Sequence, residues 1–228
     1  MSSRQEFEED LTVLLARLTT DSDEQIKNKL NILKNDLVNL RKENIVKINH
    51  SVIELVCAKY LIERNYEVQI EHPLNDFLTC DLYATKGLGN LIVEAETGFI
   101  PPENALAPLT YTSARLASKI IRYSSFAGKF ALGVPPHYIL PFPRALARPP
   151  KNRENWEIQQ IKTLVDAYYQ KPPVTPKEIE NARIHEIYII DVDHAKVQEI
   201  EPEAYLKRAM LRGIVYDYQP KEVRGQTG

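Results

Sequence analysis

Three consecutive segments between residues 66 and 97 have the pattern of β-strands, and they constrain the fold more than any other feature of the chain. YEVQIEH (66–72) alternates apolar and polar residues, TCDLYAT (79–85) is rich in strand formers, and NLIVEAET (90–97) begins with apolar, β-branched residues. The glycine-containing stretch KGLGN (86–90) predicts a tight turn, so the last two segments should pair as a hairpin. Strands of this kind bury an apolar face only against a second layer, which the rest of the chain must supply.

Helical periodicity surrounds these strands and predicts that layer. Residues 4–43 read as two helices with a break at TTDSDEQ (19–25), and a third helix runs through SVIELVCAKYLIERN from residue 51. Further along, the pattern predicts helices near 105–127 and 155–170 and strands at 129–134 and 185–193. The order of elements predicts an α/β body with a mixed central sheet flanked by helices, behind a helical N-terminus.

The N-terminal segment has a heptad pattern over slightly more than two repeats. Its apolar residues follow spacings of 4, 3, 4 and 3: Ile26, Leu30, Leu33, Leu37 and Leu40. We interpret residues 1–45 as a helical hairpin or coiled coil that either packs on the body or pairs two subunits, and we expect a homodimer. Residues 46–228 would then form the main domain, with a basic, proline-rich surface loop at 135–153.

Composition favours an intracellular protein. The chain of 228 residues is 43% hydrophobic, and no apolar run approaches the length that spans a bilayer. The N-terminal sequence MSSRQEFEED is acidic and lacks the features of a signal peptide, so we expect a cytoplasmic protein without membrane contact. Cys57 and Cys80 have no metal-ligand spacing and are interpreted as reduced core thiols.

Charge is distributed unevenly along the chain. The net charge is −2, yet residues 104–153 hold eight of the 29 basic residues and none of the 31 acidic ones. A segment of this kind attracts polyanions, most often nucleic-acid phosphates, although clustering on a solvated face or contact with acidic proteins would give the same pattern.

Acidic residues of the predicted hairpin form a candidate metal site. Glu94 and Glu96 are two apart in a strand, so both point to one face at roughly 6–7 Å. Asp81 lies on the neighbouring strand and can approach Glu94, and two converging carboxylates suit Mg²⁺. Glu54, four residues after His50 on a helix, is a candidate third acid. The alternative is an exposed edge strand whose glutamates pair with lysines.

The element order and these acids resemble the PD-(D/E)XK nuclease superfamily. The residues that carry the resemblance are Asp81 in TCDLYAT, Glu94-Ala95-Glu96 in IVEAET, and Glu54 on the preceding helix. The resemblance covers residues 50–135 and implies a restriction-endonuclease-like core. Two positions depart from the pattern, because Cys80 replaces the proline and Glu96 occupies the lysine position.

A lysine on the following helix is a candidate replacement for the one missing at Glu96. In SARLASKIIRYSSF, Lys119 and Tyr123 share a helix face at i and i+4. This pair resembles the Gln-x-x-x-Tyr element of RecB-like nucleases, with lysine in place of glutamine. The resemblance implies that Lys119 reaches Glu96 or the scissile phosphate, with Arg115 and Arg122 on flanking phosphates.

The function implied by the resemblance is metal-dependent hydrolysis of DNA phosphodiester bonds by a structure-specific, dimeric enzyme. Asp81 and Glu94, with Glu96 or Glu54, would bind Mg²⁺ or Mn²⁺, and Lys119 would stabilise charge. The DNA-binding candidates are Arg115, Arg122, Tyr123, Arg144, Arg148, Lys151 and Arg153. Two alternatives stay open: a catalytically inactive nuclease-fold protein that binds DNA or supports assembly, and a coiled-coil scaffold.

Two other groups of residues are assigned no site. The five histidines, His50 among them, are scattered along the sequence and predict no zinc site. Asp191 and Asp193 stand at strand spacing, and we expect them to end a strand in a turn.

Overall fold

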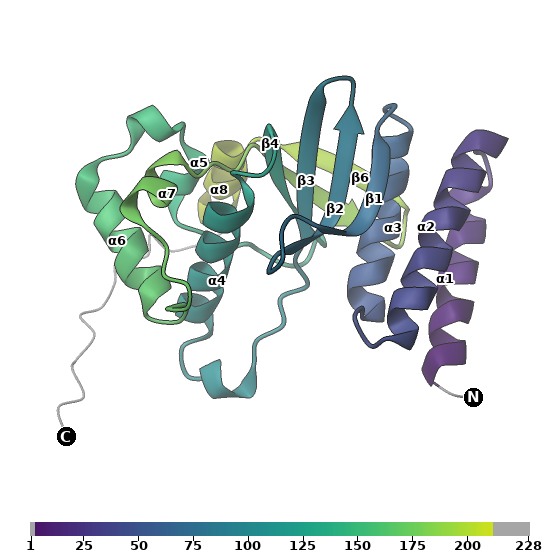
Figure 1. The fold of residues 1–228 in the computed structure, drawn as a ribbon, viewed down its shortest axis with the longest axis horizontal. Coiled ribbons are helices and arrows are strands. Elements are labelled where there is room, and N and C mark those ends of the chain that lie inside the picture. The colour runs from purple at the N-terminus through teal and green to yellow at the C-terminus, as the bar shows by residue number, and fades with distance from the viewer. Residues whose placement is uncertain (1–2, 212–228) are drawn as a thin grey trace. The chain divides into compact units, whose positions relative to one another are not determined.

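The computed structural model describes residues 3–211 and divides the chain into two compact units (Figure 1). Within the described residues, unit 1 comprises residues 3–99, 126–138 and 185–201, and unit 2 comprises residues 100–125, 139–184 and 202–211. The division therefore does not follow the boundary at residues 45 and 46 that the sequence suggested. The N-terminal helices belong to unit 1, and unit 2 is assembled from three separate parts of the chain.

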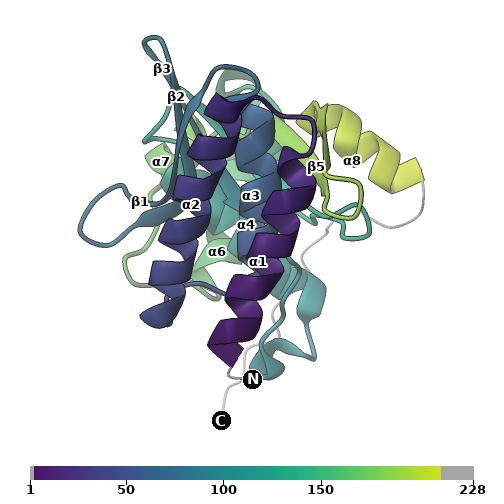
Figure 2. The ribbon, with the colours of Figure 1, turned by 90° about the vertical axis from the view of Figure 1, so that its right-hand side faces the viewer.

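Three helices of unit 1 pack together, and each contacts the other two (Figure 2). They are α1 (Ser3–Thr19), α2 (Glu24–Lys42) and α3 (Ile48–Ile62), and α1 and α2 both contact α3. Asp23 caps α2, because its side chain accepts a hydrogen bond from the Ile26 N–H at 2.8 Å. The expected helical N-terminus, broken near residues 19–25, is confirmed.

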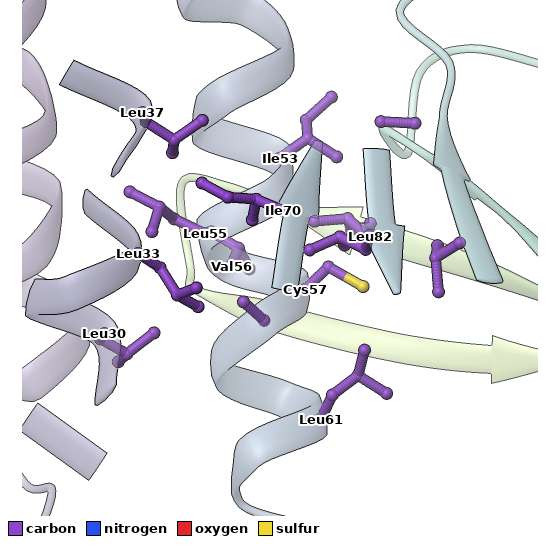
Figure 3. Packing of buried hydrophobic residues seen from close by; sticks show 14 of the residues in the cluster. Leu30, Leu33, Leu37, Ile53, Leu55, Val56, Cys57, Leu61, Ile70 and Leu82 are labelled. Carbon is purple, nitrogen blue, oxygen red and sulfur yellow. The ribbon is translucent and has the colours of Figure 1, made fainter. Parts of the chain in front are cut away.

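The heptad residues of α2 are buried inside unit 1. Leu30, Leu33 and Leu37 belong to the same hydrophobic cluster as Leu55 and Val56 of α3 (Figure 3). Burial of this stripe within one chain stabilises the fold by the usual hydrophobic contribution of about 25 cal/mol per Å². The heptad pattern is thus explained without a second subunit, and the homodimer stays a prediction.

Unit 1 contains one six-stranded mixed sheet. The strands are β1 (Glu67–Pro73), β2 (Thr79–Lys86), β3 (Gly89–Ala95), β4 (Lys129–Val134), β5 (Glu186–Asp191) and β6 (Lys196–Ile200). They lie in the order β1-β2-β3-β4-β5-β6, with β3–β4 and β4–β5 parallel and the other pairs antiparallel. The expectation of an α/β fold with a mixed sheet and helices is confirmed, while β6 had no prediction.

The predicted turn between β2 and β3 is present and sets the register of the hairpin. Lys86 pairs with Gly89, and Gly87 between them has φ +58°, a conformation that favours glycine. From this turn the pairing continues to Leu82 opposite Val93. Because strand side chains alternate, these two residues join the cluster shared with α3, whereas Asp81 and Glu94 occupy the alternate positions.

Unit 2 is mainly helical. Its elements are η1 (Pro102–Asn104), α4 (Pro108–Tyr123), α5 (Arg144–Ala147), η2 (Pro150–Asn152), α6 (Asn155–Asp166), α7 (Pro176–Asn181) and α8 (Pro202–Leu211). Helix α4 packs against α6 and α7. It begins at Pro108 and not at residue 105 as expected, because proline lacks an N–H and is well suited to the first helical position.

The proline-rich segment 135–153 is not the extended surface loop that the sequence predicted. It contains α5 and η2, and the side chains of Leu140, Phe142 and Leu146 are buried. The Leu140 N–H donates to the Tyr205 hydroxyl of α8 at 3.0 Å. The prolines determine the local backbone, but the apolar residues between them supply enough hydrophobic surface to fold residues 139–153 into unit 2.

No helix within residues 3–211 is long and apolar enough to cross a membrane.

Candidate metal centre

Asp81 and Glu94 lie together at the point where β2 and β3 stop pairing through their backbones. The last backbone pair is Leu82 with Val93, and the two acids are the next residues outward. The Asp81 N–H donates to Glu94 Oε1 at 3.1 Å, and the Ala95 N–H donates to Asp81 Oδ2 at 2.6 Å. Each carboxylate thus accepts an N–H of the opposite strand, which fixes both side chains in place.

Both glutamates of the opening β3 pattern are buried. Glu94 is 2% exposed and Glu96 3% exposed, so the alternative of a solvent-facing edge strand is wrong. The reason is topological, since β3 lies between β2 and β4 in the sheet. The Glu96 N–H donates to the Gly133 carbonyl at 2.8 Å and continues the alignment of this segment with β4. A buried carboxylate is costly without a compensating cation or donor.

Three ligand atoms converge beside this pair. One ring nitrogen of His50 and one carboxylate oxygen each of Glu54 and Asp81 lie within 4.8 Å of one another. Glu54 is fully buried, whereas His50 and Asp81 are half-buried. Donors this close on a fixed backbone match the requirement of a divalent cation for several ligands around one point.

His50 was not among the residues that sequence reasoning selected. The usable signal was its spacing of four residues from Glu54, which places both side chains on one face of α3. The scattered positions of the five histidines along the sequence gave no such signal. In the structure, His50 Nε2 also lies 3.2 Å from the Thr97 hydroxyl, two residues after β3.

The acidic residues of the site contribute to raising the pKa values of two neighbouring thiols. Burial raises the pKa of Cys80, and the Glu94 and Asp81 carboxylates raise it further. Burial likewise raises the pKa of Cys57, with Glu54 adding to the effect. Both cysteines are free and buried, so each is a neutral thiol at physiological pH and neither is an activated nucleophile.

The strand next to Asp81 is distorted. Glu71 of β1 has φ +44°, and it stands between the pairs Ile70–Leu82 and His72–Cys80. A left-handed non-glycine residue costs on the order of 1–3 kcal/mol and persists only where its surroundings enforce it. The strain therefore lies directly across the sheet from the proposed metal ligand Asp81.

Lysines occur in both units. Lys119 and Tyr123 are half-buried residues of α4 at i and i+4, as expected, and belong to unit 2, whereas the carboxylates belong to unit 1. The approach of Lys119 to Glu96 stays a prediction. Lys47, at the start of α3, was not predicted. Its Nζ lies 5.6 Å from the centre of the Phe99 ring, in the segment that carries Thr97.

Several arginines of the basic segment bind groups inside unit 2. The Arg153 guanidinium donates to the carbonyls of Ala145, Ile179, Glu180 and Arg148 at 2.7 to 3.2 Å. Burial lowers the pKa of Arg153 to about 10, so this group stays charged at neutral pH. Arg153 is thus a cross-link between backbone segments.

Two further predicted DNA-binding arginines make similar internal contacts. Arg122 donates to the Ser118 hydroxyl at 3.0 Å and to the Pro172 carbonyl at 2.5 Å. Arg148 forms a salt bridge with Glu157.

The remaining predicted DNA-binding residues of unit 2 differ in exposure. Arg115 is half-buried with its guanidinium 5.8 Å from the Tyr111 ring centre. Arg144 and Lys151 are exposed. Exposed cations are the ones that can contact a phosphate backbone without first breaking internal bonds.

The second acidic pair forms a turn, as predicted. β5 ends at Asp191, whose side chain accepts the His194 N–H at 3.1 Å and lies 2.8 Å from His194 Nδ1. This is a local turn motif.

Comparison with known proteins found no relative of this chain. No family model matches the chain, and neither a curated protein nor a solved structure does. The fold and site define an α/β protein with a six-stranded mixed sheet and a His-Glu-Asp cluster beside a buried Glu pair.

Proposed function

We propose that this protein is a divalent-metal-dependent nuclease that hydrolyses phosphodiester bonds of DNA and binds its metal ion in unit 1. The observation that carries the proposal is the His50–Glu54–Asp81 cluster, adjacent to Glu94 where the pairing of β2 with β3 ends. It occurs within the order α3-β1-β2-β3-α4-β4, on which the resemblance to the PD-(D/E)XK superfamily rests.

The donor set suits a divalent cation. Glu54 and Asp81 supply carboxylate oxygens, His50 supplies a nitrogen, and Glu94 lies within hydrogen-bonding distance of the Asp81 backbone. When bound, such an ion lowers the pKa of a coordinated water and neutralises charge on the phosphate. The Ala95 N–H holds Asp81 Oδ2, which leaves the other oxygen of that carboxylate to coordinate.

The protein groups around the donors have separate roles. Burial of Glu54, Glu94 and Glu96 excludes water from their side of the site and strengthens their attraction for a cation. The exposed Arg144 and Lys151 would hold the phosphate backbone of the substrate. Lys119 would stabilise the negative charge that develops on the phosphate.

A second function is favoured by one observation. Glu96, at the position where the superfamily has lysine, is 3% exposed and cannot supply a positive charge. A nuclease-fold protein that binds DNA without cleaving it would tolerate this residue.

The test is cleavage by matched variants. Wild type, Asp81→Asn and the control Asp76→Asn, an exposed acid of the β1–β2 loop, are incubated with plasmid, linear, single-stranded and branched DNA plus Mg²⁺ or Mn²⁺. We expect cleavage by the wild type and the control. Asp81→Asn should lose about 10³-fold in rate, since several kcal/mol of transition-state stabilisation depend on the ion.

The other outcomes are equally informative. DNA binding without cleavage of any substrate, in both metals, would overturn the enzyme and leave the inactive binding protein. Absence of salt-sensitive DNA binding would overturn both.

A further inference from the structure

The single tryptophan of the chain, Trp156, lies on the surface of unit 2. It is the second residue of α6 and is 60% exposed, although tryptophan is usually buried because of its large apolar area. The buried face of α6 is formed by other residues, among them Ile158, Ile161 and Val165. Trp156 therefore contributes little to the core, and its indole is accessible to a partner.

The face of α6 that carries Trp156 consists of uncharged side chains. Gln159, Gln160 and Thr163 follow at helical spacing on the same face, and all three are exposed. The two side-chain amides offer hydrogen-bond donors as well as acceptors. A negatively charged chain can therefore lie along this face without meeting a carboxylate.

The acidic residues next to Trp156 are engaged within their own segment. Glu154 and Glu157 form the capping box of α6, in which the Glu157 carboxylate accepts the Glu154 N–H at 2.9 Å. Glu157 also forms a salt bridge with Arg148. The positive charge of Arg148 offsets that of the Glu157 carboxylate, which reduces its repulsion of an approaching anion.

Two exposed cations belong to the same segment, Arg144 at the start of α5 and Lys151 in η2. The segment is held together from inside. The Arg153 guanidinium donates to the carbonyls of Ala145 and Arg148 at 2.7 and 3.2 Å. The salt bridge of Arg148 connects the end of α5 to the first turn of α6. An indole and two cations are thus presented by one fixed piece of backbone.

An exposed aromatic ring accompanied by cations is the combination that binds single-stranded nucleic acid. Bases stack on the ring while the cations contact the phosphates, and any base can stack because each has a π-face. In a duplex the faces of the bases are covered by their neighbours. A tryptophan on the surface therefore selects unpaired nucleotides over duplex.

We propose that this surface, formed by Arg144, Lys151, Trp156, Gln159 and Gln160, binds unpaired nucleotides of DNA. Trp156 stacks on a base, and Arg144 and Lys151 contact the phosphates that flank it. The inference rests on the proposed nuclease function and specifies the form of its substrate, a DNA that contains unpaired nucleotides. The surface lies within unit 2 and binds without a metal ion.

The fluorescence of Trp156 reports the contact directly, because the chain has no other tryptophan. The full-length wild type is titrated in chelator, which prevents metal-dependent cleavage. Single-stranded oligothymidylate should quench the fluorescence. An abasic strand of the same length, which has the phosphates without the bases, and a closed circular duplex should not. Quenching by the abasic strand or by the closed duplex equal to that by oligothymidylate would overturn the inference, as would quenching by oligouridylate alone.

Anisotropy of a labelled oligothymidylate measures the affinity of variants. Trp156→Ala should bind about 10-fold more weakly, and Trp156→Phe, which keeps an aromatic ring, only about 3-fold more weakly. Phe77→Ala is the control, because Phe77 is 93% exposed in the β1–β2 loop of unit 1, and it should bind like the wild type. Wild-type affinity of Trp156→Ala, or an equal loss in Phe77→Ala, would contradict the role of Trp156.

Failure of the inference and failure of the proposed function give different results. Quenching by oligothymidylate in a protein that cleaves no DNA with Mg²⁺ or Mn²⁺ would retain the surface and remove the nuclease. Metal-dependent cleavage without quenching, at the same rate in Trp156→Ala as in the wild type, would retain the nuclease and remove the role of Trp156.

Discussion

The two units of this protein use buried charge in opposite ways. In unit 1, like charges gather at one point, with Glu54, Glu94 and Glu96 buried and Asp81 half-buried among them. In unit 2, Arg153 distributes its guanidinium protons over four backbone carbonyls. The first arrangement places like charges where they repel one another, whereas the second stabilises the fold as it stands. Like charges gathered at one point are a mark of a site, and a charge distributed over backbone carbonyls is a mark of structure.

The comparison also changes the functional interpretation of the basic segment, residues 104–153. Its eight cations looked alike in the sequence, yet Arg122, Arg148 and Arg153 make internal bonds while Arg144 and Lys151 are exposed. A count of charges therefore overstates how many are available to a nucleic acid.

The largest expected effect concerns Arg153. Replacing it by alanine leaves four carbonyl contacts unmade, so we expect the free energy of unfolding to fall by about 3 kcal/mol in urea titration. Arg144→Ala, at an exposed position, should leave stability within about 0.5 kcal/mol of wild type. It should instead lower the salt dependence of DNA binding by about one phosphate contact. Equal destabilisation by the two variants would contradict the assignment of Arg153 as a cross-link.

The second prediction concerns which lysine supplies positive charge for catalysis, Lys119 of unit 2 or Lys47 of unit 1. We expect Lys119→Ala to lower the DNA cleavage rate by about 100-fold with unchanged circular dichroism, the usual loss of one electrostatic donor. Lys47→Ala, in unit 1, removes an exposed lysine near Phe99 and should cost only about 3-fold. The reverse order would make the lysine prediction wrong and assign the role to Lys47.

The smallest effect concerns the cost of the acidic cluster. Glu54→Gln removes one of two carboxylates that lie within 4.8 Å of each other, so the metal-free protein should gain about 1 kcal/mol of stability. The same variant should lose the stabilisation that Mn²⁺ gives the wild type. Thermal unfolding at pH 8, with and without chelator, measures both. A loss of stability in the metal-free state would mean that the contacts of Glu54 outweigh its repulsion with Asp81.

Features that depend on neighbouring residues in the chain could be predicted from the amino-acid sequence. Apolar periodicity located α1 to α3 and five strands of the sheet, and glycine marked the β2–β3 turn. Pairing across that turn predicted that Asp81 and Glu94 approach each other, because register follows directly from the length of a tight turn. Weakly patterned elements such as β6 and α5 gave no comparable signal.

Other features depend on which distant segments meet. The pairing of His50 with Thr97 and Asp81 requires α3 to lie at the end of a strand pair that follows it in the chain. The heptad stripe of α2 is equally suited to a second subunit, and it is packing against α3 that buries it in the same chain. The arginines of 104–153 are chemically alike, and only the carbonyls brought to Arg153 make it structural. Local periodicity fixes backbone conformation and the face of a side chain, but the partners across that face are chosen by packing of the whole chain.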